Sequence, residues 1–223
     1  MTLLVKICGL STPETLDVAL DAGADMVGFV FFPASPRHVA LADMPRLAKQ
    51  VSSRALKVAL TVDADDASLE AIVAALKPDM LQLHGHETPE RVSAVRQRFG
   101  LPVMKALPIA TAADLAGIPA YAAVADRLLF DAKPPKDATR PGGLGMPFDW
   151  RLLERLETPV PLMLSGGLDA GNVAEALRIT RAPGVDVSSG VERAPGEKDP
   201  EKIRAFIRAA RAAARESRLA SPA

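Results

Sequence analysis

The sequence predicts an α/β fold, a (β/α)8 TIM barrel formed by a single domain. Two observations predict it: short apolar runs alternate with stretches of helical spacing along the whole chain, and the 223 residues suit the length of this fold. No Gly- or Ser-rich linker interrupts the alternation. We assign residues 1–215 to the barrel and residues 216–223 to a frayed C-terminal tail. An open, doubly wound sheet is the alternative that the same alternation allows.

Eight runs rich in Val, Leu, Ile and Phe are strand candidates. They are residues 3–7, 25–31, 55–61, 79–84, 102–107, 127–131, 161–165 and 185–189. Helical spacing between them is clearest at residues 12–23, 66–77, 88–100 and 169–180. A cap residue followed by Pro and Glu marks helix starts at residues 12–14, 88–90 and 199–201, and Gly23 and Gly100 suit helix ends. This order of elements predicts eight strand–helix units.

The composition argues against several classes of partner. Lys and Arg total 27, as do Asp and Glu, so we expect neither nucleic acid nor a membrane as partner. No apolar run approaches the roughly 20 residues that a membrane span needs. The single cysteine excludes an intrachain disulfide and the N-terminus lacks a secretion-signal pattern, so we expect a cytoplasmic protein. Without cysteine partners or a His pair at ligand spacing, we expect no metal site.

Polar residues gather at the predicted C-terminal ends of the strands, which is where barrels of this kind carry their function. They are Cys8, Gln82, His84, Asp131, Ser165 and Ser188. Strand alternation turns Lys6 and Cys8 toward the barrel interior, and the same parity turns Gln82, His84 and Asp186 inward. Strands 1 and 8 become neighbours when a barrel closes, so Lys6 and Asp186 can form a pair. That pair is either a structural ion pair beneath the site or a direct contact with substrate.

Two turns that contain glycine predict a phosphate site. Gly166 and Gly167 follow the seventh strand, and Ser189 and Gly190 follow the eighth, where barrels often hold phosphate with backbone N–H groups and a helix N-terminus. Glycine lets the main chain approach the anion closely, although ordinary turns would also explain these residues. A third glycine group, residues 142–145, lies in a long segment, 131–150. Its composition suits either a loop that closes over substrate or a plain surface loop.

Seven segments, taken in order, carry a resemblance to a known family. They are KICGL (6–10), GADMVGFVFFPASPRHV (23–39), LQLHGHE (81–87), LLFDAK (128–133), GGLGMPFDW (142–150), LSGGLDAGNV (164–173) and GVDVSSGVE (184–192). Together they resemble the phosphoribosylanthranilate isomerases of tryptophan biosynthesis over nearly the whole chain. The resemblance implies a barrel enzyme that converts N-(5-phosphoribosyl)anthranilate to 1-(2-carboxyphenylamino)-1-deoxyribulose 5-phosphate by acid–base catalysis, without a metal or an organic cofactor.

The resemblance also implies roles for individual residues. Cys8 is the expected general base, and Asp131 is the expected general acid, of this Amadori rearrangement. An ordinary thiol is mostly protonated at neutral pH and an ordinary aspartate is ionised, so we expect the site to lower the pKa of Cys8 and to keep Asp131 protonated. Arg37 is expected to pair with the anthranilate carboxylate, which its planar guanidinium suits.

The remaining roles concern substrate and phosphate contacts. Gln82, His84 and Asp186 are expected to bind substrate. The expected phosphate-binding residues are Gly143, Gly145, Gly166, Gly167, Ser189 and Gly190. The chain departs from the family at Leu144, where a Thr or Ser is usual, so we expect altered loop closure or affinity.

Other interpretations remain open at this point. One is another phosphosugar barrel isomerase or synthase, such as the histidine-pathway aminoaldose isomerase, which carries an Asp where this chain has Cys8. Another is a non-catalytic sensor of a phosphate ligand, which would need neither Cys8 nor Asp131. A third is one half of a bifunctional or channelled assembly. We expect a small-molecule phosphosugar–anthranilate substrate and a monomer, with a homodimer as the alternative.

Overall fold

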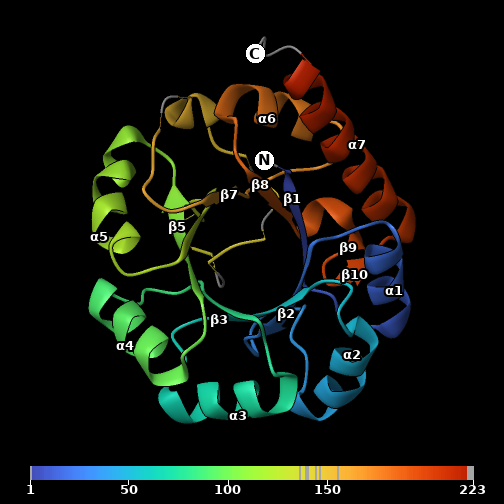
Figure 1. Cartoon of the computed structure of the whole chain (residues 1–223), viewed down its shortest axis with the longest axis vertical. Helices are drawn as coiled ribbons and strands as arrows, with labels where there is room; N and C mark the ends of the chain where they lie inside the picture. Colours follow the sequence, from blue (N-terminus) through green and yellow to red (C-terminus); the bar gives the residue numbers. More distant parts are fainter. Residues whose placement is uncertain are drawn as a thin grey trace.

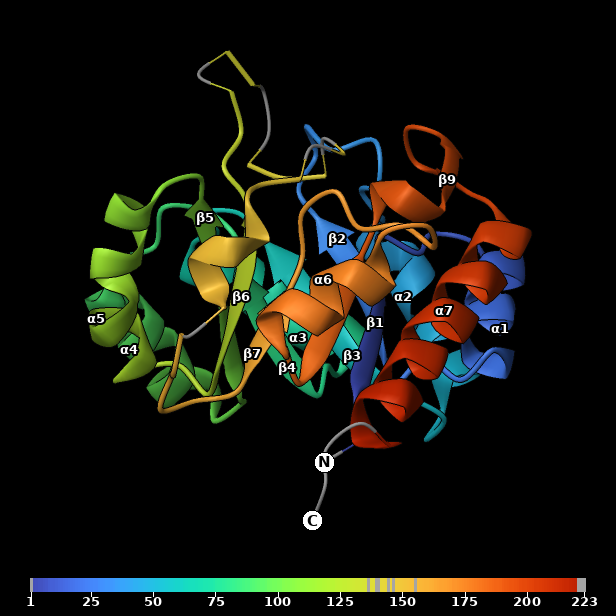
Figure 2. The same ribbon diagram turned by 90° about the horizontal axis from the view of Figure 1, so that it is seen from above.

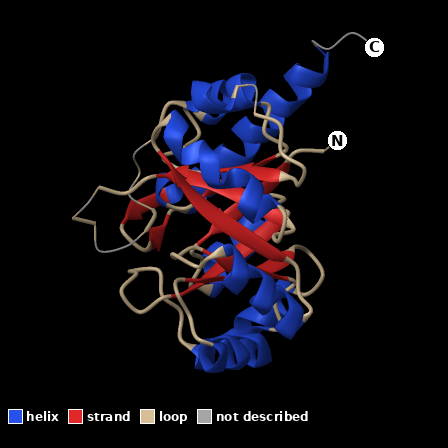
Figure 3. Cartoon of the chain, turned by 90° about the vertical axis from the view of Figure 1, so that its left-hand side faces the viewer, coloured by secondary structure: helices blue, strands red, loops and turns tan. Residues whose placement is uncertain are grey.

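The structure, a computed structural model, describes residues 2–135, 137–138, 141–143, 145, 147–154 and 156–219. Its parallel strands follow one another around a closed barrel from β1 to β8, with β8 pairing to β1, and helices surround the barrel (Figure 1). Strands lie at the centre of the molecule and helices outside them (Figure 3). This arrangement confirms the predicted fold class and excludes the open sheet.

The strand and helix bounds follow the predicted alternation closely. The barrel strands are β1 (Leu4–Cys8), β2 (Met26–Phe31), β3 (Leu56–Thr61), β4 (Met80–Leu83), β5 (Val103–Ile109), β6 (Arg127–Ala132), β7 (Leu162–Leu164) and β8 (Gly184–Val187). The helices are α1 (Pro13–Asp21), α2 (Met44–Val51), α3 (Asp66–Leu76), α4 (Pro89–Phe99), α5 (Ile118–Ala122), α6 (Val173–Thr180) and α7 (Pro200–Leu219). Short 3-10 turns are η1 (Leu41–Asp43), η2 (Ala112–Gly117), η3 (Trp150–Leu153) and η4 (Ser189–Val191).

The predicted helix caps are present. Thr12 accepts a hydrogen bond from the N–H of Thr15 at the start of α1, and Thr88 accepts one from Arg91 at the start of α4. Asp199 does the same for α7, since its carboxylate accepts from the N–H of Glu201 at 2.8 Å. Each cap satisfies a backbone donor that the first helical turn leaves free. Local sequence signals therefore set these three boundaries.

Three features differ from the prediction or lie beyond it. Between β6 and β7 the described residues contain the 3-10 turn η3 and no α-helix, so the sixth unit departs from the predicted strand–helix pattern. A small antiparallel hairpin, β9 (Glu192–Ala194) and β10 (Glu197–Lys198), is inserted between β8 and α7. Helix α7 continues past residue 215 to Leu219, while residues 220–223 lie outside the described part of the chain.

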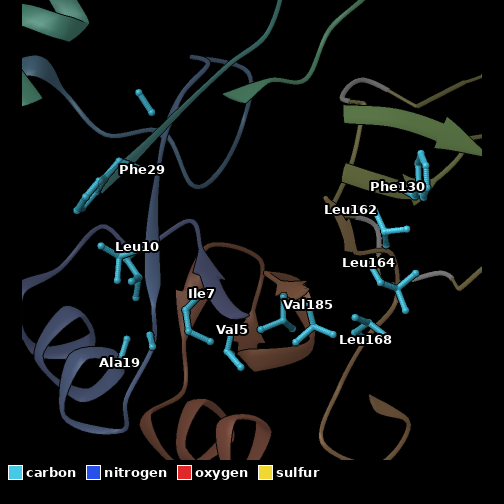
Figure 4. Close-up of a cluster of buried hydrophobic side chains, with 14 of the residues drawn as sticks. Val5, Ile7, Leu10, Ala19, Phe29, Phe130, Leu162, Leu164, Leu168 and Val185 are labelled. Carbon is cyan, nitrogen blue, oxygen red and sulfur yellow. The ribbon is translucent and has the colours of Figure 1, made fainter. Parts of the chain in front are cut away.

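The barrel wall separates two apolar layers. Side chains on the outward face, such as Val5, Ile7 and Val185, pack toward the helices (Figure 4). A separate interior cluster, rich in Met, comprises Met26, Val58, Met80, Met104, Ala106, Leu129 and Met163. Methionine fills irregular interior space well because its side chain is flexible and unbranched.

Polar side chains lie above this apolar plug, toward the C-terminal ends of the strands. Lys6, Gln82 and Asp186 are buried, and Cys8 packs there with Val30 and Leu60. The inward orientation predicted for Lys6 and Cys8 is therefore confirmed. In Figure 2, β9 and the segment that leaves β6 lie at this end of the barrel, opposite the start of β1. No helix in the described ranges is long and apolar enough to cross a membrane.

Candidate active site

A cavity opens at the C-terminal ends of the strands, and most of the predicted site residues line it. Those that line it are Cys8, Arg37, His84, Asp131, Gly143, Gly145, Gly166, Gly167, Asp186 and Ser189. Two do not. Gln82 is fully buried and contacts His84, which lines the cavity, and Gly190 packs its backbone against the carbonyl of Leu168. Leu144, the predicted departure from the family, lies outside the described residues.

Cys8 ends β1 inside the barrel, with its side chain almost fully buried. Its neighbour in the register is Gly28 of β2. A Cβ atom placed on Gly28 would lie 2.8 Å from Cys8 Sγ, closer than real contacts allow. The absence of a side chain at residue 28 therefore gives the thiol its space.

Lys6 and Asp186 form the predicted ion pair inside the barrel. The strands β1 and β8 bring the two residues into register, and Lys6 Nζ lies 2.7 Å from Asp186 Oδ1. Ser165 Oγ donates to the second carboxylate oxygen at 3.2 Å. Burial favours the neutral form of Lys6, but Asp186 and the neighbouring Cys8 outweigh it and raise the pKa of Lys6. The lysine is therefore an ammonium ion, held beside the thiol.

The expected lowering of the pKa of Cys8 is wrong for this structure. Burial raises the pKa of the thiol, and the negative charge of Asp186 adds to that increase. Lys6 and Lys198 act in the opposite direction without overcoming it. The cationic groups that could stabilise a thiolate are thus in place, but burial dominates.

Asp131 is the penultimate residue of β6, and both of its carboxyl oxygens have a close partner. Its Oδ1 accepts from the N–H of Ala132 at 2.8 Å, and its Oδ2 lies 3.2 Å from His84 Nε2. The other ring nitrogen of His84, Nδ1, lies 2.9 Å from Gln82 Nε2. The side chain of Gln82 thus fixes the ring of His84, and Nε2 of that ring faces the carboxyl group of Asp131.

Arg37 follows β2 and reaches the cavity from the side, where a carboxylate of this chain already holds it. Its Nε and Nη2 donate to Glu192 Oε1 and Oε2 at 2.7 and 2.8 Å, a bidentate pair. Nη2 also donates to the carbonyl of Gly143 at 3.2 Å. Arg37 and Glu192 are both buried, so the guanidinium is fixed in place before any substrate enters.

Sequence reasoning missed Glu192 and its second partner, Lys198. Lys198 Nζ lies 2.7 Å from Glu192 Oε1 and donates to the backbone carbonyl of Ser188 at 2.9 Å. A signal was available: Pro195-Gly196 is a strong turn dipeptide, so the flanking residues Glu192 and Lys198 can face each other across a hairpin. The pairing with Arg37 has no such signal, because 155 positions separate Arg37 from Glu192.

The two predicted phosphate turns meet beside the cavity. Gly166 and Gly167 have φ values of 87° and 66°, and among the described residues neither N–H has a hydrogen-bond acceptor. In the loop that leads to α6, Asp169 accepts from the N–H groups of Gly171 and Asn172. The amides of Gly166 and Gly167 are therefore the ones in this loop that are available to an anion.

The described residues contain no cluster of three or more His, Cys, Asp or Glu side chains placed to hold a metal ion. The titratable groups of the cavity are instead spread around its rim. Cys8 belongs to β1, Asp131 belongs to β6, and β7 and β8 separate these strands around the barrel. A ligand in the cavity can therefore contact a thiol and a carboxyl group on different sides.

Comparison with known proteins agrees with this geometry. A family model described as N-(5'phosphoribosyl)anthranilate (PRA) isomerase matches residues 5–209. An N-(5'-phosphoribosyl)anthranilate isomerase of Bradyrhizobium diazoefficiens is 73% identical over 212 residues, which cover 95% of each chain. The crystal structure of phosphoribosyl anthranilate isomerase from Thermotoga maritima has a TM-score of 0.84 at 33% identity and covers 95% of this chain and 100% of that one.

A further solved structure contains a ligand. It is a phosphoribosyl anthranilate isomerase in complex with reduced 1-(o-carboxyphenylamino)-1-deoxyribulose 5-phosphate. Its TM-score is 0.81 at 31% identity, with 95% of this chain and 100% of that chain covered. The match to the family model and the identity to a full-length relative both extend over the barrel and its rim. The chain therefore belongs to the N-(5'-phosphoribosyl)anthranilate isomerase family.

Proposed function

We propose that the chain isomerises N-(5'-phosphoribosyl)anthranilate to 1-(2-carboxyphenylamino)-1-deoxyribulose 5-phosphate, with Cys8 as general base and Asp131 as general acid. Membership of the isomerase family supports the reaction. The observation that carries the residue roles is that Cys8 and Asp131 line one cavity from different strands. A rearrangement that protonates one atom of a sugar and deprotonates another needs two such groups.

In the first step Asp131 donates a proton to the ring oxygen of the ribose. The bond between C1 and that oxygen breaks, and the lone pair of the anilino nitrogen forms a double bond to C1. The hydrogen bond from the Ala132 N–H and the close contact with His84 Nε2 hold the carboxyl group in one orientation during the transfer. The product of this step is an open-chain Schiff base.

In the second step the Cys8 thiolate removes the proton from C2. The electrons of that C–H bond form a double bond between C1 and C2, and the C1–N electrons return to nitrogen. The resulting enolamine becomes the ketone when its C2 hydroxyl loses a proton and C1 gains one. The Lys6 ammonium favours the thiolate, because it lowers the pKa of Cys8 against the effect of burial.

Three further contacts complete the proposed substrate site. Arg37 binds the anthranilate carboxylate, and the loop amides at Gly166, Gly167 and Ser189 bind phosphate. Gly143, Gly145 and Gly190 belong to the same proposed phosphate site. Support comes from the cavity, which Arg37 lines together with Gly143, Gly145, Gly166, Gly167 and Ser189. Asp186 holds Lys6, with which it forms an ion pair, and Gln82 holds His84, with which it forms a hydrogen bond.

Substitution of the two proposed catalytic groups tests the assignment. Cys8→Ala and Asp131→Asn are each expected to lower kcat by about 10²- to 10⁴-fold while product binding stays within about threefold. Asp17→Asn is a matched control, because Asp17 is exposed on α1 and pairs with Arg54. Turnover near the wild-type rate in either variant would show that the roles are misassigned. A sensor of a phosphate ligand would bind product without any turnover by the wild-type chain.

We extend the proposal to location and assembly. A cytoplasmic monomer fits the single, buried cysteine and the small number of exposed large hydrophobic side chains, of which Leu41 and Leu56 are the described examples. Light scattering coupled to gel filtration measures the mass directly. A mass of twice 23.5 kDa would identify the homodimer instead.

A further inference from the structure

Arg37 belongs to a buried cluster that no role described above explains. The cluster comprises Arg37, Glu192 and Lys198, each at most 7% exposed. Glu192 and Lys198 lie on the hairpin β9–β10, which is an addition to the repeating barrel pattern. Burying three charges is costly unless they pair well, so this cluster calls for an explanation beyond fold stability.

The carboxylate of Glu192 is saturated with donors. Its Oε1 accepts from Arg37 Nε and from Lys198 Nζ, each at 2.7 Å. Its Oε2 accepts from Arg37 Nη2 at 2.8 Å and from the N–H of Gly196 at 3.3 Å. Both oxygens receive two donors, so the carboxylate has one orientation and the guanidinium bound to it has one orientation as well.

This pairing decides which edge of Arg37 is offered to the cavity. The Nε/Nη2 edge is occupied by Glu192. Within the described residues no hydrogen bond leaves Nη1, and the only other acceptor of Nη2 is the carbonyl of Gly143. The Nη1/Nη2 edge, which the Gly143 carbonyl shares, is therefore the edge that remains for a carboxylate in the cavity.

Lys198 connects this arrangement to the end of β1. Its Nζ donates to the carbonyl and to the hydroxyl of Ser188, at 2.9 and 3.1 Å. The Ser188 hydroxyl in turn donates to the backbone carbonyl of Cys8 at 3.1 Å. The hairpin is also docked on the other side, because a Cβ atom at Gly196 would collide with the carbonyl of Pro36. Contacts of the hairpin thus extend from Cys8 at the end of β1 to Pro36, which precedes Arg37.

We propose that Glu192 and Lys198 are positioning residues that hold Arg37 with its Nη1/Nη2 edge toward the aryl carboxylate of the substrate. Glu192 sets the orientation of the guanidinium, and Lys198 anchors Glu192 to the end of β8. This inference rests on the proposed function, since it assigns a task to Arg37 at that site. The cluster carries two cations and one anion, so its net charge also favours an anionic ligand.

Glu192→Gln tests the proposal because the amide cannot replace the carboxylate. In either orientation its NH₂ group faces two donors, so two of the four hydrogen bonds are lost. The probes are reduced 1-(2-carboxyphenylamino)-1-deoxyribulose 5-phosphate and the same compound without the ring carboxylate. We expect Glu192→Gln to raise the Kd of the first probe about tenfold and to leave that of the second within about twofold.

A double-mutant cycle separates positioning from general damage. In an Arg37→Ala background, Glu192→Gln is expected to change the Kd of the carboxylated probe by less than about twofold, because no guanidinium remains to be positioned. Lys198→Met is expected to raise that Kd about threefold, less than Glu192→Gln, since both bonds between Arg37 and Glu192 stay. It also serves as the test if Glu192→Gln does not fold. Thermal unfolding is recorded for every variant.

Glu197→Gln is the matched control. It makes the same chemical change in the same hairpin, but Glu197 is exposed and pairs with Arg193 at 2.9 Å. We expect both probes to bind this variant as they bind the wild type. Equal weakening of both probes by Glu192→Gln, or an equal effect with and without Arg37, would overturn the positioning role. Wild-type turnover is assayed separately, so loss of the proposed reaction and loss of the positioning role give different results.

Discussion

Lys6 and Lys105 are both buried, and each pairs with one carboxylate, at 2.7 and 2.9 Å. Lys6 points into the barrel beside Cys8 and above the Met-rich plug. Lys105 follows the interior residue Met104 in β5 and points outward, 5.8 Å from the ring of Tyr121 in α5. Two ion pairs of similar length therefore stand on opposite faces of one barrel wall.

The neighbours of the two lysines explain their different roles. Lys105 Nζ donates to Glu87 and also to the backbone carbonyls of Leu83 and Gly85, so its donors are used within the wall. Lys6 has Asp186 and the thiol of Cys8 as its neighbours, and Asp186 lines the cavity. A buried lysine that donates to backbone carbonyls stabilises a loop, whereas a buried lysine beside a thiol changes the pKa of that thiol.

Breaking the inner pair gives the largest expected effect. Lys6→Met leaves Asp186 unpaired beside Cys8, so the pKa of the thiol rises further and kcat is expected to fall about 10²-fold. Asp186→Asn should act on the thiol in the opposite direction, because it removes a negative charge that raises the pKa of Cys8. The rate of alkylation of Cys8 against pH measures both shifts. Shifts of the same sign in the two variants would contradict this account.

The thiol itself gives the next effect. Since the pKa of Cys8 is raised, the protonated form dominates at neutral pH and the thiolate fraction grows about tenfold for each pH unit below that pKa. The rate of alkylation by iodoacetamide is therefore expected to rise about tenfold for each pH unit between about pH 6 and 8. A rate that levels off below pH 7 would show instead that the thiolate already predominates there.

Breaking the outer pair should affect stability and leave the chemistry nearly unchanged. Lys105→Met leaves Glu87 buried with its backbone partners Asp63 and Gly85 but without a counter-charge. We expect a loss of about 3–5 kcal/mol in the free energy of unfolding. At a temperature where the variant is folded, kcat should stay within about threefold of wild type. Denaturant unfolding and steady-state kinetics measure the two quantities, and a 10²-fold loss of kcat would remove the contrast with Lys6.

An exposed ion pair provides the baseline. Arg54 lies 3.0 Å from Asp17 and from Asp21, with 42% of its side chain exposed. Because solvent and salt screen such pairs, Arg54→Gln is expected to change Tm by less than about 2 °C and kcat not at all. A larger decrease in Tm would show that this ion pair stabilises the fold more than exposed ion pairs ordinarily do.

The same contrast shows what could be predicted from sequence. The pairing of Lys6 with Asp186 follows from strand parity and barrel closure, which bring residues 180 positions apart into register. The pairing of Lys105 with Glu87 depends on how the loop after β4 turns back over β5, and no periodic pattern encodes that path. The pairing of Arg37 with Glu192 also depends on the paths of loops, since both residues lie outside the regular barrel strands.

The remaining differences have equally local causes. The pKa of Cys8 depends on burial from every side, which a sequence does not report, so its direction was predicted wrongly. The expected sixth helix is a 3-10 turn within the described residues, and the rhythm of apolar runs does not distinguish the two. The cavity residues at strand ends, by contrast, followed directly from where each predicted strand stops.

The hairpin β9–β10 has a consequence for engineering this barrel. The (β/α)8 fold supports many chemistries by variation of the loops that follow its strands. Here the loop after β2 contributes an arginine whose geometry is completed by residues 192–198 after β8. A graft of either loop alone would transfer half of a recognition element, so the two must move together.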